Sequence, residues 1–173
     1  PHWLDTMLEY MDAHPNVMAA QPKVLSWNSK QECEAGKREA MCFEHAGAAG
    51  GMMDILGYPF CRGRLMTHLE DDHGQYDKVQ PIFWATGACL LTRTQVYKEL
   101  GGLDAKFFAH QEEIDLCWRM LNHAPCADNL PVLVAIPQAV VYHLGGGTLG
   151  YENPRKTFLN FRNNLLMLYK NLP

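Results

Sequence analysis

Three carboxylates stand within four positions of one another, at Glu112, Glu113 and Asp115. The hydrophobic spacing around them predicts a helix over residues 112–123, so these acids would occupy its first turn. At 3.6 residues per turn, Glu113 falls among apolar side chains, whereas Glu112 and Asp115 share the opposite face with Arg119. An apolar wall raises the pKa of a carboxyl group, and a helix amino terminus lowers it. If burial dominates, Glu113 could act as a general base near neutral pH; otherwise the three acids only cap the helix.

Two further positions could bind a ligand. His143 ends a predicted strand, and open α/β sheets gather their ligands at the carboxyl ends of strands. It could ligate a metal ion or fill a purely structural place. Arg62, close to Arg64 in the sequence, could hold a phosphate or carboxylate group with its guanidinium, or it could be an ordinary surface arginine.

Two other patterns could indicate a functional site, but their surroundings in the sequence argue against one. Residues 68–73 hold two histidines and three acids, but they lie in a polar loop without a partner segment, which favours a solvated charge run over a metal site. Gly145, Gly147 and Gly150 match the spacing of a dinucleotide-binding loop. Such a loop must open a helix, and here the next helix is predicted to begin only at Pro154, with no further strand after it. The glycines therefore predict a turn.

The composition limits the class of protein. The 173 residues are 47% hydrophobic and 20% charged, which suits one globular domain with a substantial core. The net charge of −4 and the scattered lysines and arginines argue against nucleic-acid binding. Six cysteines without a C-x-x-C pair argue against a zinc site or a disulfide framework, and they favour a reducing, cytoplasmic setting. No segment resembles a signal peptide or a membrane span.

Helical and strand patterns alternate along the chain, which predicts an α/β fold. Helices are predicted over residues 3–13, 93–100, 112–123 and 154–170. Strands are predicted over residues 17–25, 40–46, 79–85, 130–136 and 138–143. The other segments are predicted to be a polar loop over 26–38, a glycine turn over 47–51, a short helical piece over 52–56 and an irregular connection over 57–76.

Four segments, in order, resemble one known family. They are ATGACLLTR (85–93), ELGGLDAKFF (99–108), HQEEIDLCWR (110–119) and VVYHLGGGT (140–148). Together they resemble the family-2 inverting glycosyltransferases, above all the bacterial rhamnosyltransferase-like members that build surface polysaccharides. The opening residues 1–25 are similar to the segment that follows the metal-binding D-x-D motif of these enzymes, and residues 43–64 are similar to an insert of this subgroup. The resemblance covers nearly the whole chain.

The resemblance implies a particular fold. It is the C-terminal portion of a nucleotide-diphospho-sugar transferase (GT-A) fold, a mixed α/β sheet flanked by helices. Residues 1–173 would form a single partial domain that carries the acceptor side and the catalytic base. The nucleotide-binding N-terminal half with its D-x-D motif is not found in these residues, so the fragment alone is expected to be inactive.

The same resemblance assigns roles to residues. The base would be Glu113, with Glu112 and Asp115 beside it as the other catalytic acids. Glu113 stands where the family commonly has Asp, so its carboxylate reaches further by the length of a methylene group. His143 would help to hold Mg²⁺ or Mn²⁺. The substrate-binding residues would be Trp84, Thr86, Gly87, Ala88, Arg62 and Arg119.

The implied reaction transfers a sugar from a nucleotide-diphosphate sugar to a hydroxyl group of a saccharide or lipid-linked saccharide acceptor, with inversion at the anomeric carbon. Its setting would be the cytoplasm, at the inner face of the cytoplasmic membrane. The alternative is a non-catalytic carbohydrate- or protein-binding α/β module. In such a module Trp27, Tyr58 and Tyr151 would stack on sugars.

The last predicted helix leaves two choices open. Its apolar stripe consists of Phe158, Phe161, Leu165 and Leu168. Its basic residues are Arg155, Lys156, Arg162 and Lys170. This combination suits a membrane surface or a lipid-linked acceptor. Packing of the stripe onto the sheet is the alternative, and it is the expectation we adopt.

Overall fold

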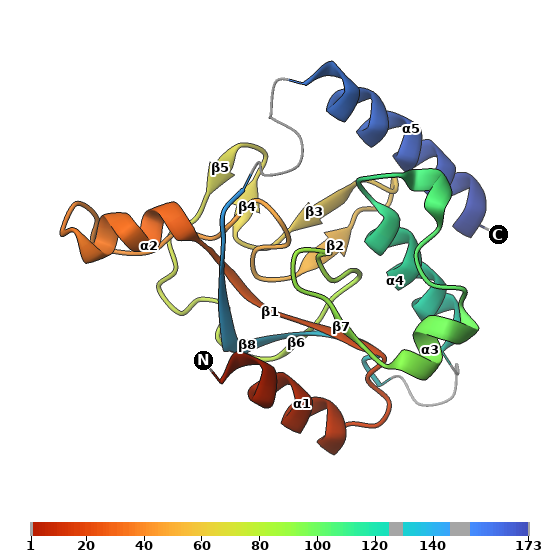
Figure 1. Cartoon of the computed structure of the whole chain (residues 1–173), viewed down its shortest axis with the longest axis horizontal. Coiled ribbons are helices and arrows are strands. Elements are labelled where there is room, and N and C mark those ends of the chain that lie inside the picture. The colour runs from red at the N-terminus through yellow and green to blue at the C-terminus, as the bar shows by residue number, and fades with distance from the viewer. Residues whose placement is uncertain (1, 125–129, 146–152, 173) are drawn as a thin grey trace.

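The computed structural model describes residues 2–124, 130–145 and 153–172. Their centre is a four-stranded sheet in the order β6, β8, β1, β7 (Figure 1). Its two long strands, β1 (Ala19–Ser26) and β8 (Leu133–His143), run parallel. Short antiparallel strands lie at the edges, with β6 (Gln80–Pro81) beside β8 and β7 (Leu91–Thr92) beside β1. This mixed sheet and its flanking helices confirm the predicted α/β class.

The two long strands are buried over most of their length. In β8 this fits a nearly continuous run of apolar and small residues, whereas β1 also buries Gln21 and Lys23, which hydrogen-bond to the Gly47 carbonyl and to Asp72. The register shifts once, because Pro22 pairs with Ile136 whereas the next residue, Lys23, pairs with Val140. Residues 137–139 therefore bulge out of the ladder at the point where Pro22 supplies no N–H group. The prediction of two strands separated at Pro137 is wrong, since β8 is one strand with an irregularity.

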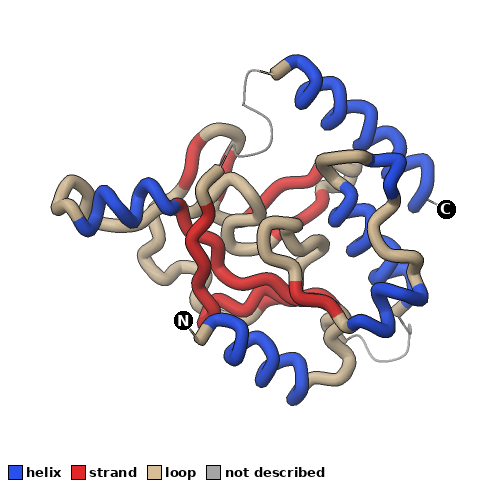
Figure 2. The backbone as a smooth tube through the Cα atoms, viewed as in Figure 1, coloured by secondary structure: helices blue, strands red, loops and turns tan. Residues whose placement is uncertain are grey.

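Helices cover both faces of this sheet (Figure 2). On one face, α1 (Trp3–Ala13) packs Met7 and Met11 against Val134 and Ile136 of β8. These two strand residues alternate with Leu133 and Ala135, whose side chains point to the opposite face. The amphipathic pattern of α1 thus closes one side of the sheet.

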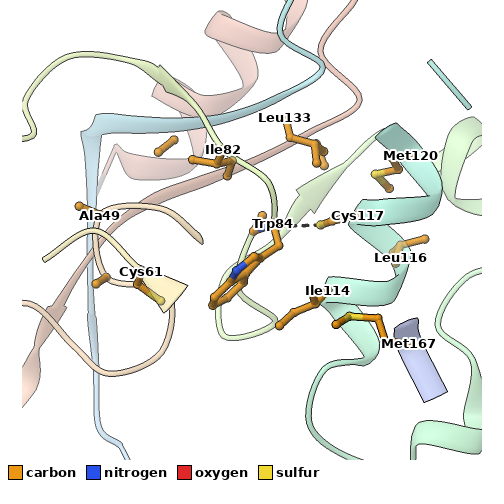
Figure 3. Close-up of a cluster of buried hydrophobic side chains, with 14 of the residues drawn as sticks. Ala49, Cys61, Ile82, Trp84, Ile114, Leu116, Cys117, Met120, Leu133 and Met167 are labelled. Carbon is orange, nitrogen blue, oxygen red and sulfur yellow. Dashed lines mark hydrogen bonds between the residues drawn. The ribbon is translucent and has the colours of Figure 1, made fainter. Parts of the chain in front are cut away.

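The larger core lies on the other face, where α4 (Glu112–His123) packs. Figure 3 shows Ile114 and Cys117 of this helix close to Trp84, with Met120 one turn further along α4 in the same core. The Trp84 indole N–H donates to the backbone carbonyl of Met52 at 2.9 Å, so the ring is fixed at its polar end as well. This core sets the position of the first turn of α4.

The remaining elements are short or lie outside the sheet. They are α2 (Trp27–Glu34), the hairpin of β2 (Gly51–Met53) and β3 (Pro59–Cys61), the hairpin of β4 (Arg64–Leu65) and β5 (His68–Leu69), α3 (Thr94–Glu99), the 3₁₀ helix η1 (Ala105–Phe107) and α5 (Pro154–Asn171). The Asn153 side chain caps α5 by accepting from the Arg155 N–H at 2.9 Å. None of the helices within the described ranges has the length and apolar character needed to cross a bilayer.

Helix predictions succeed where the hydrophobic spacing is strong. The predicted ranges 3–13 and 112–123 are the bounds of α1 and α4. The helix predicted over 93–100 is α3, which is followed by Gly101 and Gly102 with φ of 78° and 67°. The loop predicted over 26–38 is wrong, because Ser26 caps a helix there by accepting from the Ser29 N–H. The helical piece predicted over 52–56 is also wrong, since those residues form β2 and its turn.

The structure also differs from two other predictions. The strand predicted over 40–46 contains only isolated bridges, at Cys42 and Phe43. The irregular connection predicted over 57–76 contains three short strands, β3, β4 and β5. Strands of two or three residues are too short to leave a periodic signal in a sequence.

Candidate active site

A cavity of about 580 Å³ opens beside the carboxyl end of β8. Distant segments of the chain build its wall: the β4–β5 hairpin, the turn after Trp84, the start of α4, the end of β8 at His143 and the first turns of α5. The carboxyl ends of strands are where open α/β sheets place their ligands. The position and size of the cavity suit a small-molecule site.

Glu113 lines this cavity from the first turn of α4 and is partly exposed. The Gly87 backbone N–H lies 3.5 Å from its Oε1, a long hydrogen bond. Its Oε2 is buried and accepts no hydrogen bond from the described residues. Burial, and next the charge of the adjacent Glu112 carboxylate, raise the pKa of Glu113 to about 7. The carboxyl group can therefore exchange a proton near neutral pH, as a general base must.

The chain enters α4 through a strained loop. Phe108, His110 and Gln111 have φ of 65°, 71° and 70°, a region that side chains other than glycine rarely adopt. Each such residue costs on the order of 1–3 kcal/mol, so contacts from elsewhere must hold the loop. Gln111 stands at the N-cap of α4 without capping it, and its Nε2 instead donates to the backbone carbonyl of Asn160 at 3.0 Å.

Asn163 of α5 supplies much of that support. Its side chain is fully buried, and its Nδ2 lies within hydrogen-bond distance of three carbonyl oxygens of the loop. The distances are 3.0 Å to Phe107, 2.8 Å to Ala109 and 2.6 Å to His110. One amide of α5 therefore fixes the backbone from which the acidic turn emerges.

The turn after β6 is positioned from β1. Trp84 and Thr86 line the cavity. Gln21 holds the turn, because its Oε1 accepts from the Thr86 N–H at 3.0 Å and its Nε2 donates to the Gly47 carbonyl at 3.1 Å. Gly47 has φ of 81°, and a Cβ there would lie 2.4 Å from the Thr86 Cβ, so only glycine fits.

Four predicted substrate residues thus lie together near the predicted base. Trp84 and Thr86 are in the wall of the cavity, and Gly87 lies against Glu113. Ala88 follows on the exposed side of the turn, where its N–H donates to the Thr86 Oγ1 at 3.2 Å. The structure brings together residues that are 26 positions apart in the sequence.

Arg62 does not join them. Its Nη2 donates to the Pro81 carbonyl at 2.6 Å, and its side chain lies outside the wall of the cavity. Arg64 lines the cavity instead, and its Nη1 donates to the His45 carbonyl at 2.8 Å. Arg62, predicted to bind the substrate, thus lies outside the cavity, because the chain turns between the two arginines at Gly63, which has φ of 84°.

Asp115 and Arg119 also lie away from the cavity. Asp115 is fully buried, and its Oδ2 accepts from Arg119 Nε at 2.9 Å and from Lys170 Nζ at 2.9 Å. Its Oδ1 accepts from Asn171 Nδ2 at 2.9 Å. The predicted pairing of Asp115 with Arg119 is confirmed, and this network joins α4 to α5. The wall of the cavity therefore contains neither Asp115, predicted to be a catalytic acid, nor Arg119, predicted to bind the substrate. Glu112 is likewise outside the wall of the cavity.

Positive charge gathers on another part of the cavity. Arg64 of the β4–β5 hairpin and Lys156 of α5 both line it, together with His45 and His110. Burial lowers the pKa of His45, and the charges of Arg64 and Lys156 lower it further. Burial lowers the pKa of His110 as well, and Lys156 adds to that effect. Two cationic side chains from separate segments thus act on one space, which suits a phosphate group.

His143 lines the cavity at the end of β8. Its Nδ1 is 4.0 Å from Glu44 Oε2 and makes no hydrogen bond within the described ranges. An imidazole nitrogen and a carboxylate are both donors that a divalent cation accepts. However, residues 2–124, 130–145 and 153–172 contain no group of three His, Cys, Asp or Glu side chains arranged to hold a metal. Glu44 and His143 could therefore provide only part of a coordination shell.

The acidic loop predicted to be solvated has partners after all. Asp72 pairs with the buried Lys23 of β1 at 2.8 Å, and Asp71 pairs with Arg38. Glu70 accepts from the Tyr76 hydroxyl at 3.1 Å. These contacts anchor the loop to the sheet, so the expectation of a loop without a partner segment is wrong.

Several cavity residues were missed by the sequence reasoning. Glu44, His45, His110 and Lys156 all line the cavity. His110 directly precedes the acidic turn, which was a usable signal. The others come from segments far from it in the sequence, and no spacing rule connects them. Of the predicted glycine turn, only Gly145 lies within the described residues.

The sequence is similar, over part of its length, to proteins that transfer sugars. It is 33% identical over 67 residues to an N-acetylglucosaminyl-diphospho-decaprenol L-rhamnosyltransferase of Mycobacterium tuberculosis, which covers 39% of this chain and 22% of that protein. It is 27% identical over 93 residues to a low-salt glycan biosynthesis hexosyltransferase of Haloferax volcanii, covering 54% of this chain and 29% of the relative. An O-antigen biosynthesis protein of Myxococcus xanthus is 27% identical over 146 residues, covering 83% of this chain and 10% of the relative.

The matched part is thus less than a third of each of these proteins. No protein-family model matches the chain, and no solved structure matches it significantly. The similarities relate the chain to glycosyltransferases of glycan and polysaccharide biosynthesis.

Proposed function

We propose that this chain is the acceptor-side part of an inverting glycosyltransferase with a GT-A fold, and that Glu113 is its general base. The observation that carries the proposal is the state of the Glu113 carboxylate. It lines a cavity of about 580 Å³, its Oε2 has no hydrogen-bond partner among the described residues, and its pKa is about 7. The partial similarity to glycosyltransferases supports a sugar as the transferred group.

In this mechanism Glu113 accepts the proton of an acceptor hydroxyl group. The hydroxyl oxygen forms a bond to the anomeric carbon of a nucleotide-diphosphate sugar, on the face opposite the diphosphate. The bond between the anomeric carbon and the diphosphate oxygen breaks, and the nucleoside diphosphate leaves with that electron pair. Attack from the opposite face inverts the anomeric configuration. General-base assistance of this kind is worth roughly 10²–10⁴ in rate.

The cationic side of the cavity would bind the phosphate groups. Arg64 and Lys156 both line the cavity and would pair with phosphate oxygens, Arg64 as a fork donor and Lys156 as a point charge. Glu44 and His143 would contribute ligands to a Mg²⁺ or Mn²⁺ ion. When bound, such an ion neutralises negative charge on a diphosphate leaving group.

The acceptor would contact the turn after β6. Trp84 offers an aromatic edge at the cavity, and Thr86 offers a hydroxyl group. Together with Gly87 and Ala88, they form the surface nearest to the base. A saccharide or lipid-linked saccharide fits this mixture of aromatic and polar groups. The proposed setting is the cytoplasm, at the inner face of the membrane.

The decisive experiment replaces Glu113 with glutamine in the protein with its natural termini. Transfer from a panel of nucleotide-diphosphate sugars should fall by roughly 10²–10⁴, because the amide cannot accept the proton. Donor binding, measured by isothermal titration calorimetry, should be unchanged. The matched control is Glu9→Gln, an exposed glutamate on α1, which should leave both quantities as they are.

A second variant, Glu112→Gln, tests whether the pKa of Glu113 sets the pH dependence of transfer. The Glu112 carboxylate raises the pKa of Glu113, so its removal should move the pH midpoint of the transfer rate to lower pH. Transfer by Glu113→Gln at more than half of the wild-type rate would show that another group is the base.

The second candidate is a non-catalytic carbohydrate-binding module. The observation that favours it is Trp27, whose exposed ring lies 6.4 Å from that of Tyr142, measured between ring centroids. Tyr58 is exposed on the β2–β3 turn, and Tyr151 lies outside the described residues. If Trp27→Ala abolishes glycan binding and Glu113→Gln changes nothing, the module is the better description.

A further inference from the structure

The outer face of α5 is apolar and uncovered. Five side chains on that face are exposed by 55–87% of their surface, and we call them the outer stripe. They are Phe158, Phe161, Leu165, Tyr169 and Leu172. Their spacing of three and four residues aligns them along one side of the helix. The expectation that an apolar stripe of this helix packs onto the sheet is therefore wrong.

The polar face of α5 is the one that packs. Its buried residues include Asn163, Asn164 and Asn171, beside Leu159 and Met167. The three asparagine side chains donate to backbone carbonyls, and Asn171 also donates to the Asp115 carboxylate. Each buried amide is thus satisfied, which allows the helix to turn its polar side inward.

Basic side chains border the outer stripe. Arg155 lies 4.8 Å from the centroid of the exposed Phe108 ring, and Arg162 lies 5.9 Å from that of Phe158. Within the described residues neither arginine pairs with a carboxylate. α5 carries four basic residues and no acid, although the chain as a whole has a net charge of −4.

The apolar surface continues beyond the helix. Ile55 and Leu56, on the turn between β2 and β3, are fully and largely exposed respectively. Together with Leu168 of α5 and Leu172, which follows the helix, they line a second cavity of about 300 Å³. The turn is fastened to α5, because Asn164 Nδ2 donates to the carbonyl of the following Gly57 at 2.9 Å. The exposed patch therefore spans two elements that are held together.

We propose that the outer stripe docks on an anionic lipid bilayer. An apolar ridge bordered by arginines, on a helix too polar to span the membrane, is the arrangement of helices that lie in the headgroup region. A second copy of the chain is a poorer occupant, because it would bring the same basic border and α5 carries no acid to offset it. Anionic headgroups instead complement these charges.

Docking of this face has a consequence for the cavity. Lys156 and Asn160 line the cavity from the side of α5 that is turned away from the outer stripe, so the helix would separate the bilayer surface from the cavity by about its own diameter of roughly 10 Å. A lipid-linked acceptor would then be held near the cavity by its membrane anchor. The docking proposal itself depends only on α5 and its neighbours, so it stands or falls independently of the role of Glu113.

The test is co-sedimentation of the protein, with its natural termini, with lipid vesicles. The protein should pellet with vesicles of phosphatidylcholine mixed with phosphatidylglycerol, and less with phosphatidylcholine alone. Raising the salt concentration should weaken the binding. The double variant Phe161→Ser, Leu165→Ser should bind at least tenfold more weakly, since burial of each apolar side chain is worth about tenfold in partitioning.

The matched control is Leu4→Ser, Leu8→Ser, which changes two exposed leucines on α1. This variant should pellet like the wild type, and circular dichroism should show that both double variants remain folded. Equal pelleting of the outer-stripe variant, or no lipid-dependent pelleting of the wild type, would overturn the proposal. So would a lipid-free dimer that the outer-stripe variant dissociates, or an outer stripe already protected from hydroxyl-radical labelling without lipid.

Discussion

Glu113 and Asp115 stand two residues apart in the first turn of α4 and have opposite surroundings. Asp115 is fully buried, and both of its oxygens accept hydrogen bonds from Arg119, Lys170 or Asn171. Glu113 Oε1 accepts a long hydrogen bond from the Gly87 N–H at 3.5 Å, and its Oε2 has no hydrogen-bond partner among the described residues. The Asp115 carboxylate is therefore occupied by structural hydrogen bonds, whereas the Glu113 carboxylate can interact with a ligand in the cavity.

The difference shows that a place in the first turn of a helix does not decide what an acid does. Both residues feel the same helix amino terminus, which favours their charged forms. What separates them is α5, which brings the Lys170 ammonium group and the Asn171 amide to one side of α4 and leaves a cavity on the other. The partners that satisfy a carboxylate therefore mark it as structural, and their absence marks it as reactive.

The largest expected effect comes from removing the satisfied acid. Asp115→Asn should lower the free energy of unfolding by about 3–5 kcal/mol, because it leaves Arg119 and Lys170 next to an uncharged group in a buried place. Urea denaturation followed by circular dichroism would measure this loss. Asp5→Asn, an exposed acid in the first turn of α1, is the matched control and should change stability by less than about 0.5 kcal/mol. An equal loss of stability in both variants would show that the hydrogen-bond partners of Asp115 contribute no more than an exposed acid does.

Replacing Glu113, whose Oε2 has no hydrogen-bond partner among the described residues, should raise the free energy of unfolding, whereas replacing Asp115 lowers it. Glu113 holds its proton in the folded state up to pH of about 7, but only to about 4.5 when unfolded. Between those values the folded state binds more protons, so the stability of the wild type falls as pH rises through this window. Glu113→Gln lacks the titrating group, so it should match the wild type at pH 4 and exceed it at pH 8. Each pH unit between the two values is worth about 1.4 kcal/mol, which sets the gain at about 3 kcal/mol at most.

This second comparison needs only thermal or urea unfolding of the two proteins at several pH values. Other titrating groups are common to both proteins, so they cancel in the difference. Glu9→Gln should show no pH-dependent difference, because Glu9 is exposed. A Glu113→Gln variant that is less stable than the wild type at pH 8 would contradict the raised pKa.

Much of α4 and its chemistry could be predicted from the sequence. Its bounds, the pairing of Asp115 with Arg119 and the position of Glu113 toward apolar neighbours follow from the periodicity of a helix. The same periodicity could not show that Asp115 is buried, because its other partners are 55 and 56 residues away on α5. Periodicity reports which residues share a face, and tertiary contacts decide what that face meets.

For α5, too, the periodicity shows which residues share a face and not what that face contacts. Its apolar stripe was visible in the sequence, but a stripe has the same spacing whether it faces a core or a solvent. The opposite face carries Asn163, Asn164 and Asn171, a polar composition that is also typical of a solvated side. Their amides instead satisfy backbone carbonyls of the loop before α4 and of the β2–β3 turn, which only the assembled structure reveals. The short strands of the two small hairpins were missed because two or three residues carry no periodic signal.

The smallest expected effect concerns how α5 supports Glu113. Asn163→Ala removes the amide that binds the carbonyls of Phe107, Ala109 and His110, so the strained loop before α4 should relax. A small displacement of a catalytic group can cost a large factor in rate, and we expect kcat to fall by about tenfold. The pH midpoint of the reaction should also move down, since a displaced Glu113 would be less buried. Steady-state kinetics over a range of pH measures both quantities.

The neighbouring asparagine provides the control for this variant. Asn164 is also buried on α5, but its amide donates to Gly57 on the β2–β3 turn, away from the acidic loop. Asn164→Ala should therefore lower stability to a similar degree and leave the pH midpoint in place. If the two variants lose activity equally with no change in midpoint, Asn163 acts only through stability. If only Asn163→Ala moves the midpoint, α5 secures Asp115 by direct contact and Glu113 through the loop that Asn163 holds.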